Sequence, residues 1–135
     1  MFVAGAAGNA FGRPLTSQLP GATSRLHGVV VRANDGSNGR TVAIRRGQRL
    51  TVVLSSTYWR LQPSSNTSVL SLVDRPKINP QLSGCVPGGG CGTATATYLA
   101  SGAGHATVTA TRTSCGEALR CIGANGQFTV HVFVR

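Results

Sequence analysis

Short runs in which apolar and polar residues alternate recur along most of the chain, and Gly, Pro, Asn or Ser separate them. In segment 49–54 every second residue is Leu or Val, and segment 127–134 repeats the pattern with Phe and Val. Because successive side chains of a strand point to opposite faces, such runs predict strands with one buried face. No stretch keeps apolar residues at helical spacing over three turns, so we expect almost no helix.

The spacing of these runs predicts an all-β fold, an immunoglobulin-like antiparallel β-sandwich of about seven strands. Residues 92–100 and 105–113, joined across Ser101–Gly104, are expected to form a β-hairpin. A loop rich in Pro and Gly is expected over 74–90. The strand-like segments are 27–33, 40–45, 49–54, 58–61, 69–73, 92–100, 105–113 and 127–134.

The first part of the chain differs from the rest. Residues 1–24 are rich in Gly, Ala, Pro and Ser without a clear period, which predicts an extended N-terminal arm or linker. Its scattered apolar residues could dock on the chain's own domain or add to the sheet edge of a neighbouring copy. We therefore expect one sandwich domain over 25–135, and a homo-oligomer formed through 1–24 is one hypothesis.

The formal net charge is +10, although only 12% of the residues are charged. Such a charge attracts polyanions, so binding to nucleic acid or to an acidic wall polymer is a further hypothesis. Only Arg45 and Arg46 are adjacent among the basic residues. This dispersion lacks the compact basic cluster that grips nucleic acid, and it favours a role of the charge in solubility.

Four cysteines form two pairs with equal spacing, Cys85 with Cys91 and Cys115 with Cys121. Proximity favours two local disulfides, although four cysteines permit three connectivities. A four-cysteine zinc site is the alternative, but five intervening residues match structural zinc poorly. Disulfides indicate an oxidising compartment, so we expect a secreted or cell-surface protein.

Membrane and export signals are weak in this sequence. Residues 1–10 lack the basic and apolar regions of an intact signal peptide, which we expect to have been removed. No run of about 18 apolar residues is present, so no membrane span is predicted.

Residues that could carry catalysis are scarce. The acids Asp35, Asp74 and Glu117 are isolated in the sequence, which argues against paired-carboxylate chemistry. His27, His105 and His131 lack metal-binding spacings. We therefore predict no enzyme activity, no metal and no cofactor.

Aromatic and glycine residues supply candidate binding positions. Trp59 follows Tyr58 on a short strand, where a lone Trp either packs between the sheets or anchors a binding loop. The glycines of segment 88–90 lack the Lys and helix of a phosphate-binding loop, and we expect them to serve turn geometry.

Several of these segments together resemble the chagasin-like inhibitors of papain-type cysteine proteases, and also bacterial immunoglobulin-like surface domains. The resemblance covers roughly residues 40–134. The Cys85–Gly92 and Thr113–Cys121 segments are also similar to secreted proteins of GC-rich bacteria. The segments that carry the first resemblance are Val42-x-Ile44, Gly47-Gln48, Leu50-x-Val52-x-Leu54, Tyr58-Trp59, Thr95-Ala96-Thr97-Tyr98, Gly104-His105-Ala106-Thr107-Val108 and Phe128-x-Val130-x-Val132.

In the chagasin-like family three loops enter the protease cleft. The first, Asn-Pro-Thr-Thr-Gly-aromatic-x-Trp, corresponds here to 55–59, which lacks Asn-Pro and the Gly. The second, Gly-x-Gly-Gly, corresponds to 88–92. The third, Arg-x-Pro-Trp, corresponds to Arg112 followed by the loop between Cys115 and Cys121.

The leading hypothesis is a non-enzymatic extracellular binding or structural module, whose partner is a protein or a cell-surface polymer. Loops stiffened by disulfides bind with less ordering cost, which favours this hypothesis. A chagasin-like protease inhibitor is the alternative. The candidate binding residues are Tyr58, Trp59, Gly89, Gly90, Arg112 and Arg120.

Overall fold

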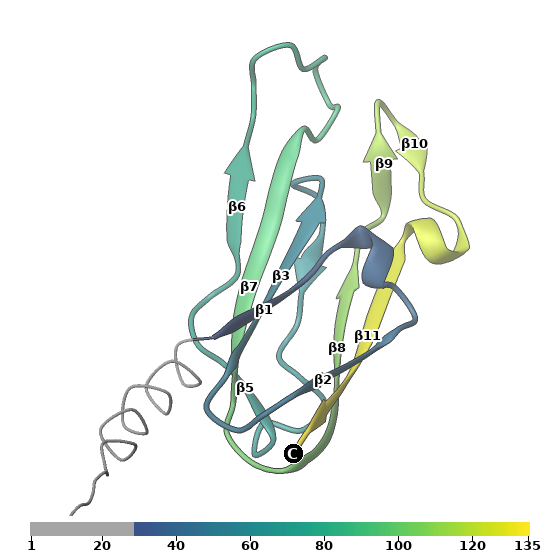
Figure 1. Cartoon of the computed structure of the whole chain (residues 1–135). Coiled ribbons are helices and arrows are strands. Elements are labelled where there is room, and N and C mark those ends of the chain that lie inside the picture. The colour runs from purple at the N-terminus through teal and green to yellow at the C-terminus, as the bar shows by residue number, and fades with distance from the viewer. Residues whose placement is uncertain (1–28) are drawn as a thin grey trace, which may run out of the picture.

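The computed structural model describes residues 29–135, which fold into two facing β-sheets with a small third sheet at one end (Figure 1). The first sheet has the order β1-β3-β7-β5, and β6 also pairs with β7. The second has the order β2-β11-β8-β4, and β9 and β10 form the third. The strands are β1 (Val30–Ala33), β2 (Thr41–Ile44), β3 (Arg49–Ser55), β4 (Arg60–Leu61), β5 (Leu70–Leu72), β6 (Lys77–Pro80), β7 (Gly92–Ala100), β8 (Gly104–Thr111), β9 (Ser114–Gly116), β10 (Leu119–Arg120) and β11 (Gln127–Val134).

Alternating burial builds the core between the two large sheets. Leu50, Val52 and Leu54 of β3 are fully buried, and the residues between them are exposed or half-buried. The inner positions of β11, from Phe128 to Val134, show the same alternation. The expectation of an all-β sandwich is therefore confirmed. The only helices in residues 29–135 are two short 3-10 helices, η3 (Asp35–Ser37) and η4 (Gly123–Asn125).

The predicted hairpin between residues 92–100 and 105–113 is wrong. β7 pairs with β3, β5 and β6, whereas β8 pairs with β11 and β4 in the opposite sheet. The Ser101–Gly104 connection thus carries the chain from one sheet to the other. Alternation predicted that each strand has one buried face, but it does not say which strand is the neighbour. The inner residues of β7 and β8 are instead buried in the core between the two sheets.

Two further differences from the expected strands lie at the end of the molecule that carries β9 and β10. The loop expected over 74–90 contains the edge strand β6, whose four residues are all exposed. Pro80 ends β6, which agrees with the tendency of Pro to occur at sheet edges. The segment between the second cysteine pair folds as the β9–β10 hairpin. The predicted arm over 1–24 and His27 lie outside the described residues.

The crossover from β1 to β2 brings an acidic residue to this end of the sandwich. β1 runs parallel to β3 and β2 runs parallel to β11, so the chain changes sheets between them. η3 makes this change, with the Asn34 side chain accepting a hydrogen bond from the backbone N–H of Gly36. The Asp35 carboxylate accepts the backbone N–H of Ser55 at 3.0 Å. The acid is therefore fixed beside the last residue of β3.

Tyr98 is the largest fully buried side chain of the core. Its hydroxyl donates a hydrogen bond to the carbonyl oxygen of Gln62 at 2.6 Å. Burial raises the pKa of the Tyr98 phenol well above its usual value, because the charged form loses its hydration. Tyr98 is thus a neutral structural donor that ties the two sheets together.

Candidate functional site

Three connections meet at the end of the sandwich where β3 ends and β7 begins (Figure 1). They are Ser56–Trp59 between β3 and β4, residues 81–91 between β6 and β7, and residues 112–122, which contain the β9–β10 hairpin. We call these three segments the loop end. The C-terminal residue lies at the opposite end of the sandwich.

Backbone hydrogen bonds hold the three segments to one another. The N–H of Thr57 donates to the carbonyl oxygen of Gly90 at 2.9 Å, which joins the first segment to the second. The N–H of Glu117 donates to the carbonyl oxygen of Gly88 at 2.9 Å, which joins the third segment to the second. The glycine-rich segment is therefore the central one of the three.

Tyr58 packs directly on this central segment. Its hydroxyl donates to the carbonyl oxygen of Gly88 at 2.9 Å. A Cβ atom on Gly90 would overlap the Tyr58 ring. Gly88 and Gly90 have φ angles of 76° and 68°, which L residues rarely adopt. Turn geometry and contact with the aromatic ring together require glycine at position 90, so the structure brings the candidates Tyr58 and Gly90 into contact.

Gly89 lies between these two glycines and contacts the first disulfide. A Cβ on Gly89 would come within 3.1 Å of the Cys85 sulfur and 3.0 Å of the carbonyl oxygen of Val86. The absence of a side chain therefore allows the loop to fold tightly around its own disulfide.

Both local disulfides predicted from spacing are confirmed. Cys85 is bonded to Cys91 and Cys115 to Cys121, with Cα separations of 6.0 Å and 5.1 Å. Because no free cysteine is present in the described part of the chain, the zinc alternative is wrong. Each bridge closes one of the two longer segments of the loop end.

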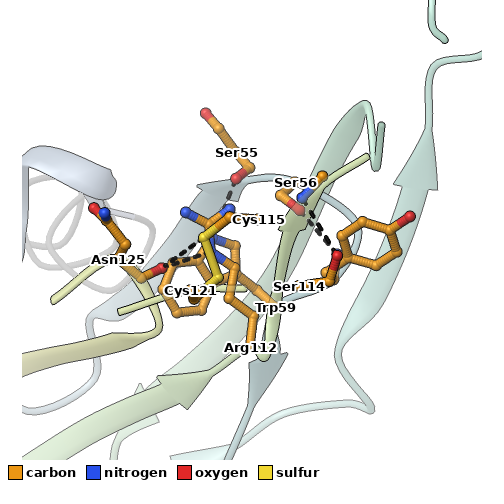
Figure 2. The surroundings of a disulfide bond; sticks show 10 residues. Ser55, Ser56, Trp59, Arg112, Ser114, Cys115, Cys121 and Asn125 are labelled. Atoms are coloured by element: carbon orange, nitrogen blue, oxygen red, sulfur yellow. Dashed lines mark hydrogen bonds between the residues drawn. A yellow bond between two sulfur atoms is a disulfide. The ribbon is translucent and has the colours of Figure 1, made fainter. Parts of the chain in front are cut away.

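Trp59 and Arg112, from the first and third segments of the loop end, form a stacked pair. The Trp59 side chain is only 6% exposed and belongs to the core. The Arg112 guanidinium carbon lies 4.4 Å from the centre of the Trp59 ring. Figure 2 shows this pair next to the Cys115–Cys121 disulfide. Of the two interpretations of Trp59, the structure agrees with core packing, and Arg112 covers the ring.

Arg120 lies in β10 and is exposed. It therefore sits on the β9–β10 hairpin, in the same segment as Arg112. Among the six candidate residues the structure brings two pairs into contact, Tyr58 with Gly90 and Trp59 with Arg112. Gly89 contacts the first disulfide, and Arg120 shares only the hairpin segment with Arg112.

Unusual backbone conformations of residues 29–135 gather at the loop end. The non-glycine residues with positive φ are Ser56 at 120°, Glu117 at 47° and Ala118 at 68°. A left-handed conformation costs an L residue about 1–2 kcal/mol. It persists where the surrounding structure holds it, and such positions cluster at functional sites. The sequence signal was absent, because Glu-Ala does not resemble the Asn-Gly usual in such turns.

The most exposed large apolar side chains of the described residues also lie here. Leu82 and Ile122 are 81% and 80% exposed, and Leu119 is 65% exposed. A pocket of about 360 Å³ lies beside Tyr58 and is lined partly by Leu82 and Val86. Exposed apolar side chains at one end of a fold are candidates for an interaction surface. Sequence reasoning missed these residues because each is a single apolar residue inside a loop.

Features of other classes of site are sparse within residues 29–135. No group of three or more His, Cys, Asp or Glu lies close enough to hold a metal ion in this part of the chain. None of its helices is both long and apolar enough to cross a membrane.

Comparison with solved structures identifies related folds. The cysteine protease inhibitor EhICP2 from Entamoeba histolytica matches with a TM-score of 0.55 and 13% identity, covering 78% of this chain and 95% of that one. Amebosin matches with a TM-score of 0.52 and 16% identity, covering 79% and 99%. This chain shares their fold. PbICP-C, solved in complex with falcipain-2, has a TM-score of 0.43 at 12% identity over 78% and 96%.

Sequence comparisons do not extend this result. No family model matches the chain, and no curated protein sequence matches it significantly. The fold therefore agrees with the chagasin-like resemblance, and the resemblance to bacterial surface domains stays a prediction.

Proposed function

We propose that this chain is a non-enzymatic binding protein whose loop end inhibits a papain-type cysteine protease. The observation that carries the proposal is the joining of three loops by backbone hydrogen bonds at one end of a fold that EhICP2 shares. These are the loops that the chagasin-like resemblance places in the protease cleft. The motifs differ, so the fit would depend on this chain's own side chains.

The loop end is suited to fill a protein cleft without being cleaved. Its disulfides and shared hydrogen bonds fix the loops before binding, which lowers the ordering cost. Glycines 88–90 allow close approach of a partner's backbone. The exposed apolar residues Leu82, Leu119 and Ile122 would contribute buried area at the centre of the interface. Inhibition would then arise from blocking access to the cleft, with no covalent step.

This proposal is tested by adding the purified protein to papain of known active-site concentration and measuring the remaining protease activity. We expect inhibition to be complete when the protein and papain are equimolar, at micromolar concentrations or below. Leu119→Asp should weaken inhibition by about tenfold or more, because it places a charge in the apolar contact. Val29→Asp is the matched control, since Val29 is 38% exposed and lies before β1, outside the loop end.

The proposal has two decisive outcomes. Full papain activity at about 10 µM protein, far above the concentration of a micromolar complex, would contradict inhibition of this enzyme class. Equal loss of inhibition in Leu119→Asp and Val29→Asp would show that the loop end is not the binding surface.

A further inference from the structure

Arg112 differs from every other arginine in residues 29–135 because it is half-buried and the others are exposed. It lies directly after β8, where its own N–H donates to the carbonyl oxygen of Gly126 at 3.0 Å. Partial burial of a guanidinium is costly unless its hydrogen-bonding groups are satisfied.

Two contacts fix the plane of the Arg112 guanidinium. Nε donates to the carbonyl oxygen of Asn125 at 2.7 Å, and the face of the group lies over the Trp59 ring. Figure 2 shows Arg112 beside Trp59, with its hydrogen bond to Asn125 drawn as a dashed line. Nε is the only atom of the Arg112 side chain that donates a hydrogen bond within the described residues. The two terminal nitrogens, which form the fork that binds planar anions, thus stay available.

Arg112 lines a pocket of about 240 Å³. Trp59 and Phe128 supply its apolar walls, and Asp35 lies in the same lining. Asn38, also in the lining, is occupied, because its side chain donates to the carbonyl oxygen of Gln127 and accepts the N–H of Thr129. The Trp59 indole N–H is occupied by the carbonyl oxygen of Ser55.

We propose that Arg112 binds a carboxylate of a polypeptide partner in this pocket. This inference rests on the proposed function, which supplies a protein at the loop end, and it names a chemical requirement on that partner. The terminal nitrogens would donate two parallel hydrogen bonds to the carboxylate. Trp59 acts as a positioning residue, because its ring holds the guanidinium plane.

Asp35 narrows the class of ligand. Its carboxylate accepts the N–H of Ser55 and retains free lone pairs. The negative charge of Asp35 repels any anion that enters the pocket. It repels phosphate and sulfate more strongly, because they carry more charge than a carboxylate. A peptide offers a single carboxylate for Arg112 together with a backbone N–H for Asp35. An acidic residue in a polypeptide therefore fits both groups.

Titration of the ¹⁵N-labelled protein with short peptides tests this site without any protease. The probes are acetyl-Ala-Glu-Ala-amide, its Gln counterpart, and acetyl-Ala-Ala-Ala with a free C-terminal carboxylate. The readouts are the Nε–H signal of Arg112 and the indole N–H signal of Trp59, which is the only Trp of the chain. We expect saturable shifts with the Glu peptide at millimolar concentration, as is typical of one ion pair in water.

The three peptides distinguish the sources of the carboxylate. Saturation by the Glu peptide alone indicates a side-chain carboxylate, and saturation by the free-acid peptide alone indicates a C-terminus; both outcomes support the carboxylate site. Equal shifts with the Glu and Gln peptides, or no saturable shift with either acid, would overturn it.

Variants assign the effect to the guanidinium. Arg112→Gln should abolish the saturable shift of Trp59, and Arg112→Lys should weaken binding by about tenfold, because an ammonium lacks the planar fork. Arg60→Gln is the matched control, since Arg60 follows Trp59 in sequence but is exposed. Thermal melting verifies that each variant is folded, and unchanged binding in folded Arg112→Gln would refute the assignment.

The outcomes separate this inference from the proposed function. Peptide binding without papain inhibition would keep the carboxylate site and remove the protease as the partner. Papain inhibition without peptide binding would keep the inhibitor and remove the role of Arg112.

Discussion

The sandwich body and the loop end of this molecule are stabilised in different ways. In the body, Leu50, Val52 and Val130 are fully buried, and area removed from water is the main favourable term. At the loop end, Leu82 and Ile122 are largely exposed, and disulfides and backbone hydrogen bonds hold the chain. The body is therefore built for stability, whereas the loop end displays apolar side chains on a fixed backbone.

This contrast separates two kinds of substitution. A change in the body should alter the free energy of unfolding and leave the binding surface intact in the folded protein. A change at the loop end should alter binding more than stability. Four variants probe the two regions, in order of decreasing expected effect on stability.

Leu50→Ala should lower the free energy of unfolding by about 3 kcal/mol, because it leaves a cavity at a fully buried position. Urea denaturation measures the change, and papain inhibition by the folded variant should be unchanged. Val29→Ala, at a position 38% exposed, is the control and should change stability by less than about 0.5 kcal/mol. Similar losses in both variants would contradict the placement of the core.

Replacing both Cys115 and Cys121 with Ser should cost about 2 kcal/mol, because the disulfide no longer restricts the unfolded chain. The hairpin would also lose the bridge that holds Glu117 and Ala118 at positive φ. We therefore expect weaker papain inhibition as well as a lower denaturation midpoint. Unchanged inhibition in this variant would show that the second stapled loop does not contribute to binding.

Gly90→Ala should lower the free energy of unfolding by about 1–2 kcal/mol, because position 90 combines a positive φ with contact to the Tyr58 ring. Gly84→Ala is a matched control, since Gly84 has a φ of 74° but open space where a Cβ would lie. The difference between the two variants isolates the contact with Tyr58. Equal melting temperatures would mean that Tyr58 moves aside without cost.

Ala118→Gly should raise the free energy of unfolding by up to about 1 kcal/mol, because glycine adopts a φ of 68° without steric strain. Ala124→Gly serves as the control, because Ala124 lies in η4 and is not among the positive-φ residues. Thermal melting compares the two. A loss of stability in Ala118→Gly equal to that of the control would exclude strain at the hairpin tip.

Alternation in the sequence predicted the body well because it follows directly from the geometry of a strand. Segments 49–54 and 127–134 coincide with β3 and β11 almost residue for residue. The pairing partner of each strand was harder to predict, because the same alternation in β7 and β8 is compatible with a hairpin or with strands in two facing sheets. The edge strand β6 lacked any alternation of burial that a pattern could reveal.

The loop end was predictable only in part. Equal cysteine spacing predicted both disulfides, and the resemblance brought Tyr58, Gly90 and Arg112 together as candidates. The stacking of Arg112 on Trp59 depends on the meeting of β4 with the end of β8, which are far apart in sequence. The positive φ angles at Glu117 and Ala118 depend on the bridge and on the contact with Gly88. No local sequence pattern encodes either feature.

The pairing of β2 with β11 has a consequence for how this chain reaches its native state. Thr41 lies opposite His131, so an early strand and a late one are neighbours in the same sheet. The β7–β8 connection also places consecutive strands in different sheets, which leaves few pairings between sequence neighbours. Chains dominated by such distant contacts fold slowly, typically in milliseconds to seconds. The second sheet can close only after its last strand has been synthesised, and until then β2 and β8 expose edges open to misassembly.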